Sequence, residues 1–441
     1  MDFKEHITSL LGKEKYNRLV SSLEDKPFSA IHINTNKFNI DSETYKMFTG
    51  QMKNHPFVKN AYYINEKMGN HPYHIAGGFY IQEPSAMLVG EIIPVEKDDL
   101  VIDICAAPGG KSSHIANKLS ENGLLISNEI NYPRAKILSE NIERQGIKNC
   151  IITNEDIDTL INTYSGIFDK VILDAPCSGE GMFRKNDLVK NDWSYDKVLK
   201  CATTQKDLIL KSYKLLKNNG IMIYSTCTFS KEENEDVINY LLEKTNASLI
   251  NIEPFKNLSR GIDMPEALRI FPFDFEGEGH FVALIKCNDY NKEIRKNYAG
   301  KKINQNVLKL LDSFCQDNLT YRFDPKRIYI KNDDIYYLPT KIIGFENLRH
   351  LRVGQHIGKV LKNRIEPSHG FAMSSKKENF QRVINLTLHD ELMLSKFIHG
   401  ETLNVDLENG YCLILIDGMS IGYGKVVNNI LKNLFPKGLR K

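Results

Sequence analysis

The feature that most constrains the fold is a regular alternation of short apolar runs and helical patterns across the middle of the chain. The apolar runs are LVIDIC, GLLISNE, CIITNED, FDKVILDAP and GIMIYSTC, and the clearest helical patterns are KSSHIANKL and PRAKILSENIERQG. Such alternation is typical of a parallel sheet with helices on both faces. Pro133 at the start of the second helical pattern and Gly146 just past its end fit the usual helix boundaries. We therefore predict an α/β domain with a doubly wound, mostly parallel sheet.

Length and composition predict further domains around this one. A chain of 441 residues is expected to form two or three domains, and 41% hydrophobic with 26% charged residues is typical of a globular protein. The polar stretch NDYNKEIRKNYAGKKINQN predicts a linker, and the short β-rich runs beyond it predict a small accessory domain. We expect a lead-in region at 1–95, the α/β domain at 96–290, a linker and accessory domain at 291–370, and a last domain at 371–441.

The charge pattern permits a nucleic-acid partner without requiring one. The net charge is only +3, but no acidic residue follows Asp417, whereas basic residues accumulate after it beside Tyr423 and Phe435. An ordinary solvated basic tail is one interpretation, and the aromatic residues interleaved with the lysines make a surface that binds a nucleic-acid backbone an equal alternative. The basic residues of the tail are Lys425, Lys432, Lys437, Arg440 and Lys441.

The cysteines indicate a reduced, intracellular protein. Eight are scattered along the chain without a CxxC pair, which fits neither a disulfide framework nor a zinc site. The N-terminus has charges within its apolar pattern and does not resemble a signal peptide. No apolar run approaches the roughly 20 residues that a membrane helix needs. We therefore expect a cytoplasmic location, no metal, no membrane contact, and a monomer by default.

A glycine-containing loop after the first strand indicates a ligand site. In VIDICAAPGGKSS, Gly109 and Gly110 stand between a buried strand and a helix, where the backbone can approach a ligand and the helix offers unpaired N–H groups. A phosphate-binding P-loop requires GxxxxGK[ST], and its leading glycine position here holds Cys105. The dinucleotide pattern GxGxxG fails as well. The loop therefore favours a nucleoside ligand that lacks a phosphate group.

Two acidic residues follow the next strands. Glu129 lies 20 residues after Gly109, close to the spacing of about 20 at which a carboxylate meets a ribose hydroxyl. Asp156, after the third strand, is placed to meet the base edge of the same nucleoside. Either residue alone is more often a helix or turn cap, but both beside a glycine loop favour a ligand. The common nucleoside cofactor without phosphates is S-adenosylmethionine.

Two thiols and a carboxylate stand at the ends of the fourth and fifth strands, in DAPCSGEG and STC. Because neighbouring parallel strands end at one crevice, Asp174, Cys177 and Cys227 are expected to face the reactive end of the cofactor together. A thiolate that adds to carbon-6 of a pyrimidine makes carbon-5 nucleophilic enough to accept a methyl group, and a nearby acid stabilises the charged adduct. A helix start after each thiol favours its thiolate form. Packing is the expectation for Cys150, Cys201, Cys287, Cys315 and Cys412.

The motifs CAAPGGK, DAPCSGEG and STCTFSKEENE resemble, in this order, those of the Nop/Sun family of RNA cytosine-5 methyltransferases. The resemblance extends over residues 75–287, and the tail resembles the PUA-like RNA-binding module of the bacterial RsmF branch. It implies Cys227 as nucleophile and Cys177 as the thiol that assists product release. The implied contacts of S-adenosylmethionine are Cys105, Ala106, Ala107, Pro108, Gly109, Gly110, Lys111, Glu129, Asp156 and Asp174.

The resemblance implies a Rossmann-like S-adenosylmethionine-dependent methyltransferase domain with an α+β N-terminal region and a small β-rich, PUA-like C-terminal domain. The expected activity is methylation of carbon-5 of cytidine in small-subunit ribosomal RNA, with ribosomal RNA or the small subunit as partner. One departure is Phe273, where the family usually has a histidine after the proline of RIFPFDF. The alternatives are a DNA cytosine methyltransferase with Cys177 as nucleophile, an assembly factor without turnover, and a P-loop ATPase.

Overall fold

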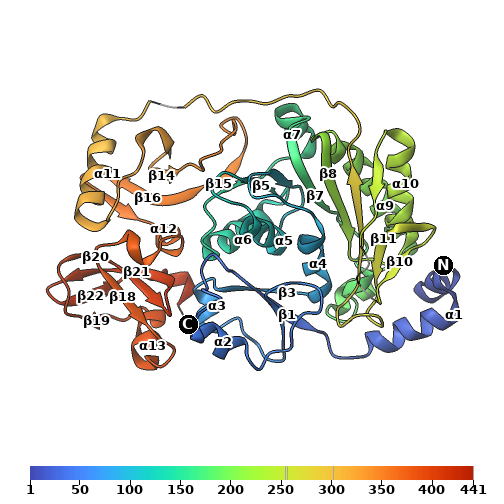
Figure 1. Ribbon diagram of the computed structural model, residues 1–441, viewed down its shortest axis with the longest axis horizontal. Coiled ribbons are helices and arrows are strands. Elements are labelled where there is room, and N and C mark those ends of the chain that lie inside the picture. Colours follow the sequence, from blue (N-terminus) through green and yellow to red (C-terminus); the bar gives the residue numbers. More distant parts are fainter. Residues whose placement is uncertain (254, 256, 301, 441) are drawn as a thin grey trace.

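A mixed sheet forms the centre of the molecule in the computed structural model, which describes residues 1–253, 255, 257–300 and 302–440 (Figure 1). Its middle consists of parallel strands in the order β6-β5-β4-β7-β8. The chain therefore builds one half of the sheet outward from β4 and then returns to build the other half, which leaves a crevice at the point of reversal. The strands are β4 (Leu100–Asp103), β5 (Leu124–Asn128), β6 (Cys150–Thr153), β7 (Phe168–Asp174) and β8 (Leu216–Thr226).

Helices cover both faces of these strands, which explains why the strands are apolar at nearly every position. On one face Ile102 and Ile126 pack with side chains of α7 (Ile157–Tyr164), α9 (Tyr195–Tyr213) and α10 (Glu235–Lys244). On the other face the alternate residues Val101 and Leu125 pack with α4 (Pro84–Ile92), α5 (Gly110–Lys118) and α6 (Tyr132–Arg144). The predicted α/β, doubly wound fold is confirmed, and α6 begins and ends where Pro133 and Gly146 predict.

Antiparallel strands extend the sheet at both edges. Beyond β8 lie β12 (His280–Lys286), β11 (Met264–Ile270) and β10 (Ser259–Gly261), and β9 (Ser248–Ile250) also pairs with β12. At the other edge β15 (His350–Val353) pairs with β6, although the two strands are about 200 residues apart in the chain. Arg352 of β15 donates to Glu143 of α6 at 2.7 Å. The segment after the linker thus completes the central sheet, which the sequence did not predict.

The N-terminal region is α+β, as expected. It contains α2 (Glu43–Thr49) and α3 (Pro72–Ile75) beside an antiparallel sheet of order β2-β1-β3, and α1 (Phe3–Leu23), which packs instead on Phe229 and Phe271 of the central domain. The strands are β1 (Ser29–Ile33), β2 (Ala61–Ile64) and β3 (Phe79–Gln82). The chain passes from β3 directly into α4, so this region abuts the central sheet at the end that carries the glycine loop.

Two further sheets follow the linker, which contains neither helix nor strand at its described residues between Lys286 and Gln305. The first sheet has the order β13-β14-β16-β17 and is accompanied by α11 (Gln305–Asn318) and α12 (His369–Met373); the second has the order β18-β20-β21-β22-β19 and carries α13 (Glu391–His399). The strands are β13 (Ile328–Lys331), β14 (Asp334–Tyr337), β16 (Gln355–Leu361), β17 (Arg364–Pro367), β18 (Val383–Leu386), β19 (Leu403–Asn404), β20 (Gly410–Ile416), β21 (Met419–Val427) and β22 (Ile430–Asn433). The β-rich C-terminal part is therefore as expected.

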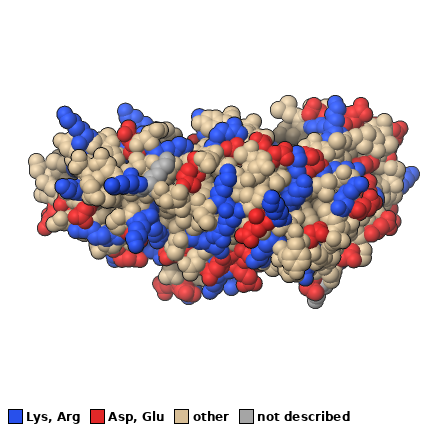
Figure 2. All heavy atoms as spheres, turned by 90° about the horizontal axis from the view of Figure 1, so that it is seen from above, with Lys and Arg blue, Asp and Glu red and all other residues tan. Residues whose placement is uncertain are grey.

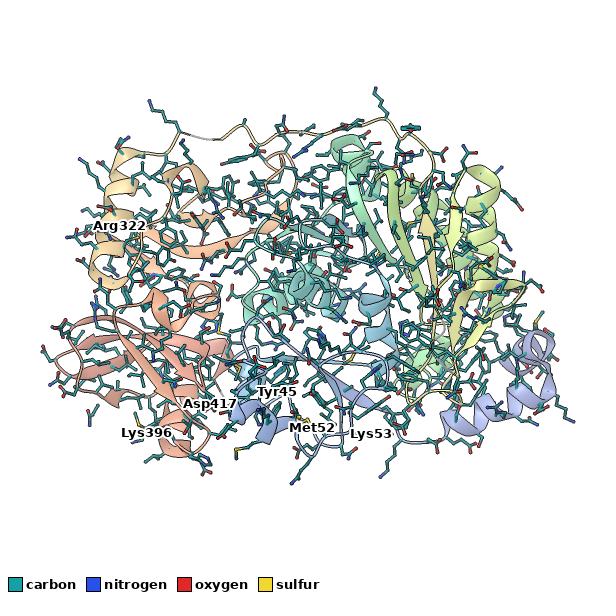
Figure 3. All side chains as sticks on the ribbon, in the orientation of Figure 1. Tyr45, Met52, Lys53, Arg322, Lys396 and Asp417 are labelled. Atoms are coloured by element: carbon teal, nitrogen blue, oxygen red, sulfur yellow. The ribbon has the colours of Figure 1, made fainter. Side chains whose placement is uncertain are left out.

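The two ends of the chain share one hydrophobic core. Ile31 and Phe79 of the N-terminal sheet belong to the same buried cluster as Phe397 and Ile414 of the C-terminal domain. Tyr73 donates to Asp417 across this contact at 2.7 Å, and Figure 3 shows Asp417 close to Tyr45 there. The terminal domains therefore form one continuous body beneath the central sheet.

This shared core gives a stability prediction. Phe397 is fully buried and its ring lies 5.6 Å from that of Phe435. Phe397→Ala leaves a cavity and is expected to lower the free energy of unfolding by about 3–5 kcal/mol, measured by urea denaturation. Leu392→Ala, on the same helix but 70% exposed, is the matched control and should change it by less than about 0.5 kcal/mol. Equal effects of the two substitutions would contradict a shared core.

Charged side chains of both signs are mixed on one face of the molecule. On the face shown in Figure 2, Lys and Arg are interspersed with Asp and Glu rather than gathered into a single basic patch. This mixture agrees with the small net charge of +3. A polyanion that binds this face would therefore be recognised by contacts with individual side chains, because the face carries no large positive electrostatic potential. None of the helices in the described part of the chain is long and apolar enough to cross a membrane.

Candidate active site

The glycine loop lies at the crevice of the central sheet, between β4 and α5. Gly109 caps α5 with φ +114°, a conformation that L side chains rarely adopt, and no side chain caps this helix. A Cβ on Gly110 would lie 2.9 Å from the Cδ atom of Gln82. The loop is fixed from outside, since Arg134 donates to the Ala107 carbonyl and Asn141 to the Pro108 carbonyl. The backbone N–H groups at the start of α5 are therefore open to a ligand.

Two carboxylates beside this loop have buried oxygens that accept no hydrogen bond from a described residue. Asp103, at the end of β4, accepts from Ser112 through Oδ2 at 2.7 Å, while its Oδ1 has no donor. Burial raises the pKa of Asp103 to about 7. Glu129 follows β5; its Oε1 accepts from the Asn131 N–H, and its Oε2 has no hydrogen-bond donor but lies 3.4 Å from Arg134. Buried acceptors without donors fit a ligand that carries hydroxyl or amino groups.

Asp156 takes the capping position that was the alternative to a ligand contact. It is the N-cap of α7, and its two oxygens accept from the backbone and the hydroxyl of Thr159 at 2.9 and 3.0 Å. The preceding residue, Glu155, pairs instead with Arg349 of the segment before β15. A carboxylate that caps a helix keeps lone pairs free, so the cofactor contact of Asp156 stays a prediction.

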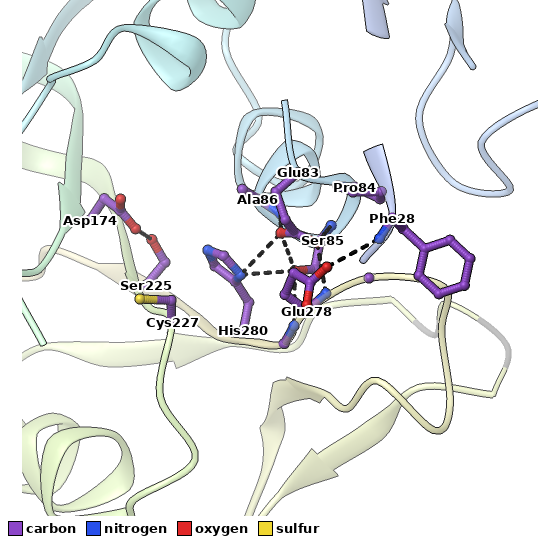
Figure 4. Close-up of polar contacts among 12 residues, drawn as sticks. Phe28, Glu83, Pro84, Ser85, Ala86, Asp174, Ser225, Cys227, Glu278 and His280 are labelled. Carbon is purple, nitrogen blue, oxygen red and sulfur yellow. Dashed lines mark hydrogen bonds and ion pairs between the residues drawn. The ribbon is translucent and has the colours of Figure 1, made fainter. Parts of the chain in front are cut away.

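Lys111 and Asp174 form an ion pair on the other side of the glycine loop. The Lys111 ammonium lies 2.7 Å from Oδ2 of Asp174, and Ser225 donates to Oδ1 at 2.7 Å (Figure 4). Burial raises the pKa of Asp174, but Lys111, His280 and the two hydrogen bonds outweigh burial and leave the pKa below its usual value. Asp174 is therefore a carboxylate at neutral pH. The Lys111 ammonium is paired with this carboxylate. In a P-loop the lysine binds phosphate groups instead, so the pairing argues against the P-loop alternative.

The two thiols predicted to share the site do so. Asp174 and Ser225 are register partners on β7 and β8, so Cys177 and Cys227 leave the sheet side by side. Their Sγ atoms are 3.1 Å apart and both side chains are half-buried. The contact with Cys227 and burial raise the pKa of Cys177. The expectation that its surroundings favour a thiolate is therefore wrong for Cys177, which keeps its proton at neutral pH.

Buried polar groups hold the two cysteine loops in place. Glu233 accepts from the Ser178 N–H at 2.9 Å and from Gln205 at 2.8 Å through one oxygen, and burial raises the pKa of this residue to about 7. The Gly181 N–H donates to the carbonyl of Cys227 at 2.8 Å. These contacts tie the loop after β7 to the loop after β8. The motif STCTFSKEENE contains Glu233, but its partners Ser178 and Gln205 are far away in the sequence and could not be predicted from it.

The other cysteines and Phe273 lie outside the pair of thiols. Cys150, Cys287, Cys315 and Cys412 are buried and Cys201 is half-buried on α9, while burial raises the pKa of Cys105 within the loop. Phe273, which replaces the family histidine, stacks on Phe271 at 4.9 Å and carries the Arg18 guanidinium on its ring. Among the described residues no cluster of His, Cys, Asp and Glu could hold a metal ion.

The ion pair gives a pH prediction. In Lys111→Met, Asp174 stays buried but loses its cation, so the pKa of Asp174 rises. If the ionised carboxylate is the working form, the variant should lose activity at a higher pH than the wild type as the pH falls. The acid limb of the pH–rate profile should move upward by about 1–3 units. Lys118→Met, on the same helix but paired with Glu91, should leave that limb in place. Identical profiles for the two variants would contradict the assignment.

A glycine loop at the reversal point of a parallel sheet, with unpaired acceptors beside it and no phosphate-binding pattern, fits the class of Rossmann-like S-adenosylmethionine-dependent methyltransferases, and the comparisons with known proteins show this class. Residues 91–286 match the family described as 16S rRNA methyltransferase RsmB/F. Residues 1–84, 313–374 and 386–441 match the N-terminal domain, the first C-terminal domain and the PUA domain of RsmF. The chain therefore belongs to the RsmF family of 16S rRNA methyltransferases, as the sequence motifs predicted, and it is an RNA methyltransferase.

Individual relatives agree with this assignment. The chain is 31% identical to ribosomal RNA small subunit methyltransferase F of Vibrio atlanticus, over 99% of this chain and 97% of that protein. It is 30% identical to the protein of the same name from Shewanella oneidensis, over 93% and 90%. Among solved structures, a methyltransferase homolog from Pyrococcus horikoshii has a TM-score of 0.57 at 26% identity, over 64% of this chain and 93% of that one. NSun6 from the same organism, at 21% identity and a TM-score of 0.59, shares the fold.

Proposed function

We propose that this enzyme methylates carbon-5 of cytidine in small-subunit ribosomal RNA through a covalent bond between Cys227 and carbon-6 of the target base. The observation that carries the proposal is the pair of thiols with Sγ atoms 3.1 Å apart, close to the half-buried carboxylate of Asp174, where β7 and β8 end. The names of its relatives support ribosomal RNA as the substrate.

The residues divide the chemistry among them. Cys227, as thiolate, adds to carbon-6, which breaks the aromaticity of the ring and makes carbon-5 an enamine-like nucleophile. Asp174 takes the role of stabilising the protonated N3 and N4 side of the adduct through its negative charge. Once carbon-5 has accepted the methyl group, water or Asp174 takes its proton, the electron pair of that C–H bond restores the double bond between carbon-5 and carbon-6, and the thiolate of Cys227 leaves carbon-6. Cys177 keeps its proton and supports that departure from 3.1 Å away.

S-adenosylmethionine supplies the methyl group when it is bound. We assign its contacts to the loop from Cys105 to Lys111 and to Glu129, Asp156 and Asp174, with Asp103 added by its unpaired Oδ1. The free N–H groups of α5 and the unpaired oxygen of Glu129 support this placement. The cost of turning the target base out of its stack is a few kcal/mol. We propose that the N-terminal and PUA domains hold the RNA, and that the enzyme works in the cytoplasm, where its substrate is made.

Two measurements test the function. Wild-type protein should transfer labelled methyl groups to small subunits from cells that lack this chain, and digestion should release the label as 5-methylcytidine. With RNA that contains 5-fluorocytidine it should form a covalent protein–RNA complex, because fluorine at carbon-5 blocks the last elimination. Absence of methyl transfer would favour an assembly factor, and label in DNA alone would favour the DNA methyltransferase alternative.

A further inference from the structure

A buried histidine at the edge of the site has no part in the chemistry described so far. His280 is the first residue of β12, and its neighbour Phe281 is the register partner of Thr226, the residue before Cys227. The side chain is only 6% exposed. Gly279 precedes it with φ +125°, and a Cβ there would lie 2.5 Å from the ring of Phe229. The backbone at this point is therefore fixed, and the imidazole is held against the end of β8.

Hydrogen bonds determine which ring nitrogen of His280 carries the proton. Both oxygens of Glu83 are acceptors, because the backbone N–H groups of Ser85, Ala86 and Glu278 donate to them at 2.8–2.9 Å, and such bonds favour the ionised carboxylate. The Ser85 hydroxyl must therefore donate to Glu83. Its oxygen accepts from the Gly279 N–H at 3.3 Å and lies 2.9 Å from Nδ1 of His280. Because that hydroxyl proton is already used, Nδ1 must be the donor, and Nε2 of the neutral ring is an unprotonated acceptor.

That second nitrogen faces the reaction centre. Figure 4 shows the His280 ring between Ser85 and Glu83 on one side and Asp174, Ser225 and Cys227 on the other, with its free nitrogen toward Asp174. Among the described residues Nε2 has no hydrogen-bond partner. Burial and the nearby Lys111 lower the pKa of His280, so the ring is neutral at physiological pH. The site therefore contains a lone pair that nothing in the protein uses.

We propose that Nε2 of His280 accepts a hydrogen bond from the exocyclic amino group of the target cytosine and so distinguishes cytidine from uridine. This inference rests on the proposed function. Cytosine carries two amino hydrogens on N4, which suit two acceptors, Asp174 and His280. Uracil carries a carbonyl oxygen at the same position and would bring three acceptors together without a donor. Glu83 and Ser85 are positioning residues, because they act only by fixing the proton on Nδ1.

The test compares two RNAs that differ only in the amino group. One contains 5-fluorocytidine and the other 5-fluoropyrimidin-2-one ribonucleoside, and the rate of covalent adduct formation is measured for each. His280→Phe should slow the adduct with 5-fluorocytidine by about 10- to 100-fold. It should leave the rate with the pyrimidin-2-one unchanged, because that base has no hydrogen to donate. His280→Gln, which keeps an acceptor oxygen, should recover part of the rate with 5-fluorocytidine.

Two further comparisons make the result decisive. Ser85→Ala should cause the same base-selective loss, smaller in size, because Nδ1 then loses the acceptor that fixes the tautomer. Equal slowing of both RNAs by His280→Phe and His280→Gln would overturn the inference and assign His280 a structural role. If the wild-type protein forms no adduct with either RNA, the proposed function itself fails. These two failures are therefore distinguishable.

Discussion

Cys227→Ala is expected to abolish covalent complex formation with 5-fluorocytidine RNA and to lower the rate of methyl transfer by about 10³-fold or more. The reason is that carbon-5 of an aromatic cytosine ring is a poor nucleophile, and Cys227, whose Sγ lies 3.1 Å from that of Cys177, is the thiol that we propose adds to carbon-6 and breaks the aromaticity. Binding of S-adenosylmethionine, measured by calorimetry, should persist, because the glycine loop and Glu129 are untouched.

Cys201→Ala is the matched control for this prediction. Cys201 is also half-buried and lies on α9, outside the pair of thiols, so its loss should leave adduct formation and methyl transfer unchanged. If Cys227→Ala still forms the adduct and Cys177→Ala does not, the nucleophile is Cys177. The chemistry would then be that of the DNA cytosine methyltransferases.

Cys177→Ala is expected to trap the enzyme on its substrate. A covalent complex should persist with RNA that contains ordinary cytidine, visible as a shifted band under denaturing conditions, and turnover should fall by about 10²-fold or more. Cys177 retains its proton and lies 3.1 Å from the sulfur of Cys227, so its S–H stabilises the negative charge that returns to Cys227 as the bond to carbon-6 breaks. Without that donor the adduct forms but its elimination stalls.

Cys177→Ser separates the loss of the donor from the loss of the side chain. Serine keeps an O–H at nearly the same place, so the trapped complex should decay faster than in Cys177→Ala. If both variants turn over at the wild-type rate, Cys177 takes no part in release. If neither variant forms any complex, Cys177 is needed before the adduct, contrary to the proposed order.

The central sheet could be predicted because its information is local. Strands covered on both faces are apolar at consecutive positions, as in LVIDIC, and the helices between them carry their own boundary residues, as Pro133 and Gly146 do for α6. The glycine loop and the two cysteines were recognisable for a related reason, since each is a short motif that follows a strand directly. Parallel topology then requires that the ends of β7 and β8 meet, and their thiols do.

The rest of the site comes from residues that are far apart in the chain. Ser85 and His280 are separated by 195 positions, and only the packing of α4 against β12 brings them into contact. The histidine expected near Phe273 is absent, while His280, which no pattern indicated, reaches the site instead. Asp103 appeared to be an ordinary strand residue until its unpaired oxygen was found beside the glycine loop. Contacts between residues that are so far apart in the chain cannot be predicted from the periodicity or spacing of residues within one segment.

By itself, the sequence determined the α/β core and indicated the glycine loop and the two thiols, because strand burial, helix ends and strand-end motifs depend on neighbouring residues. The tertiary structure alone decided that β15 completes the central sheet, that the two ends of the chain share one core, and that His280 faces Asp174 with a fixed tautomer. The physical reason is that these features are pairings across long loops, whose partners are selected by packing and hydrogen bonding in three dimensions.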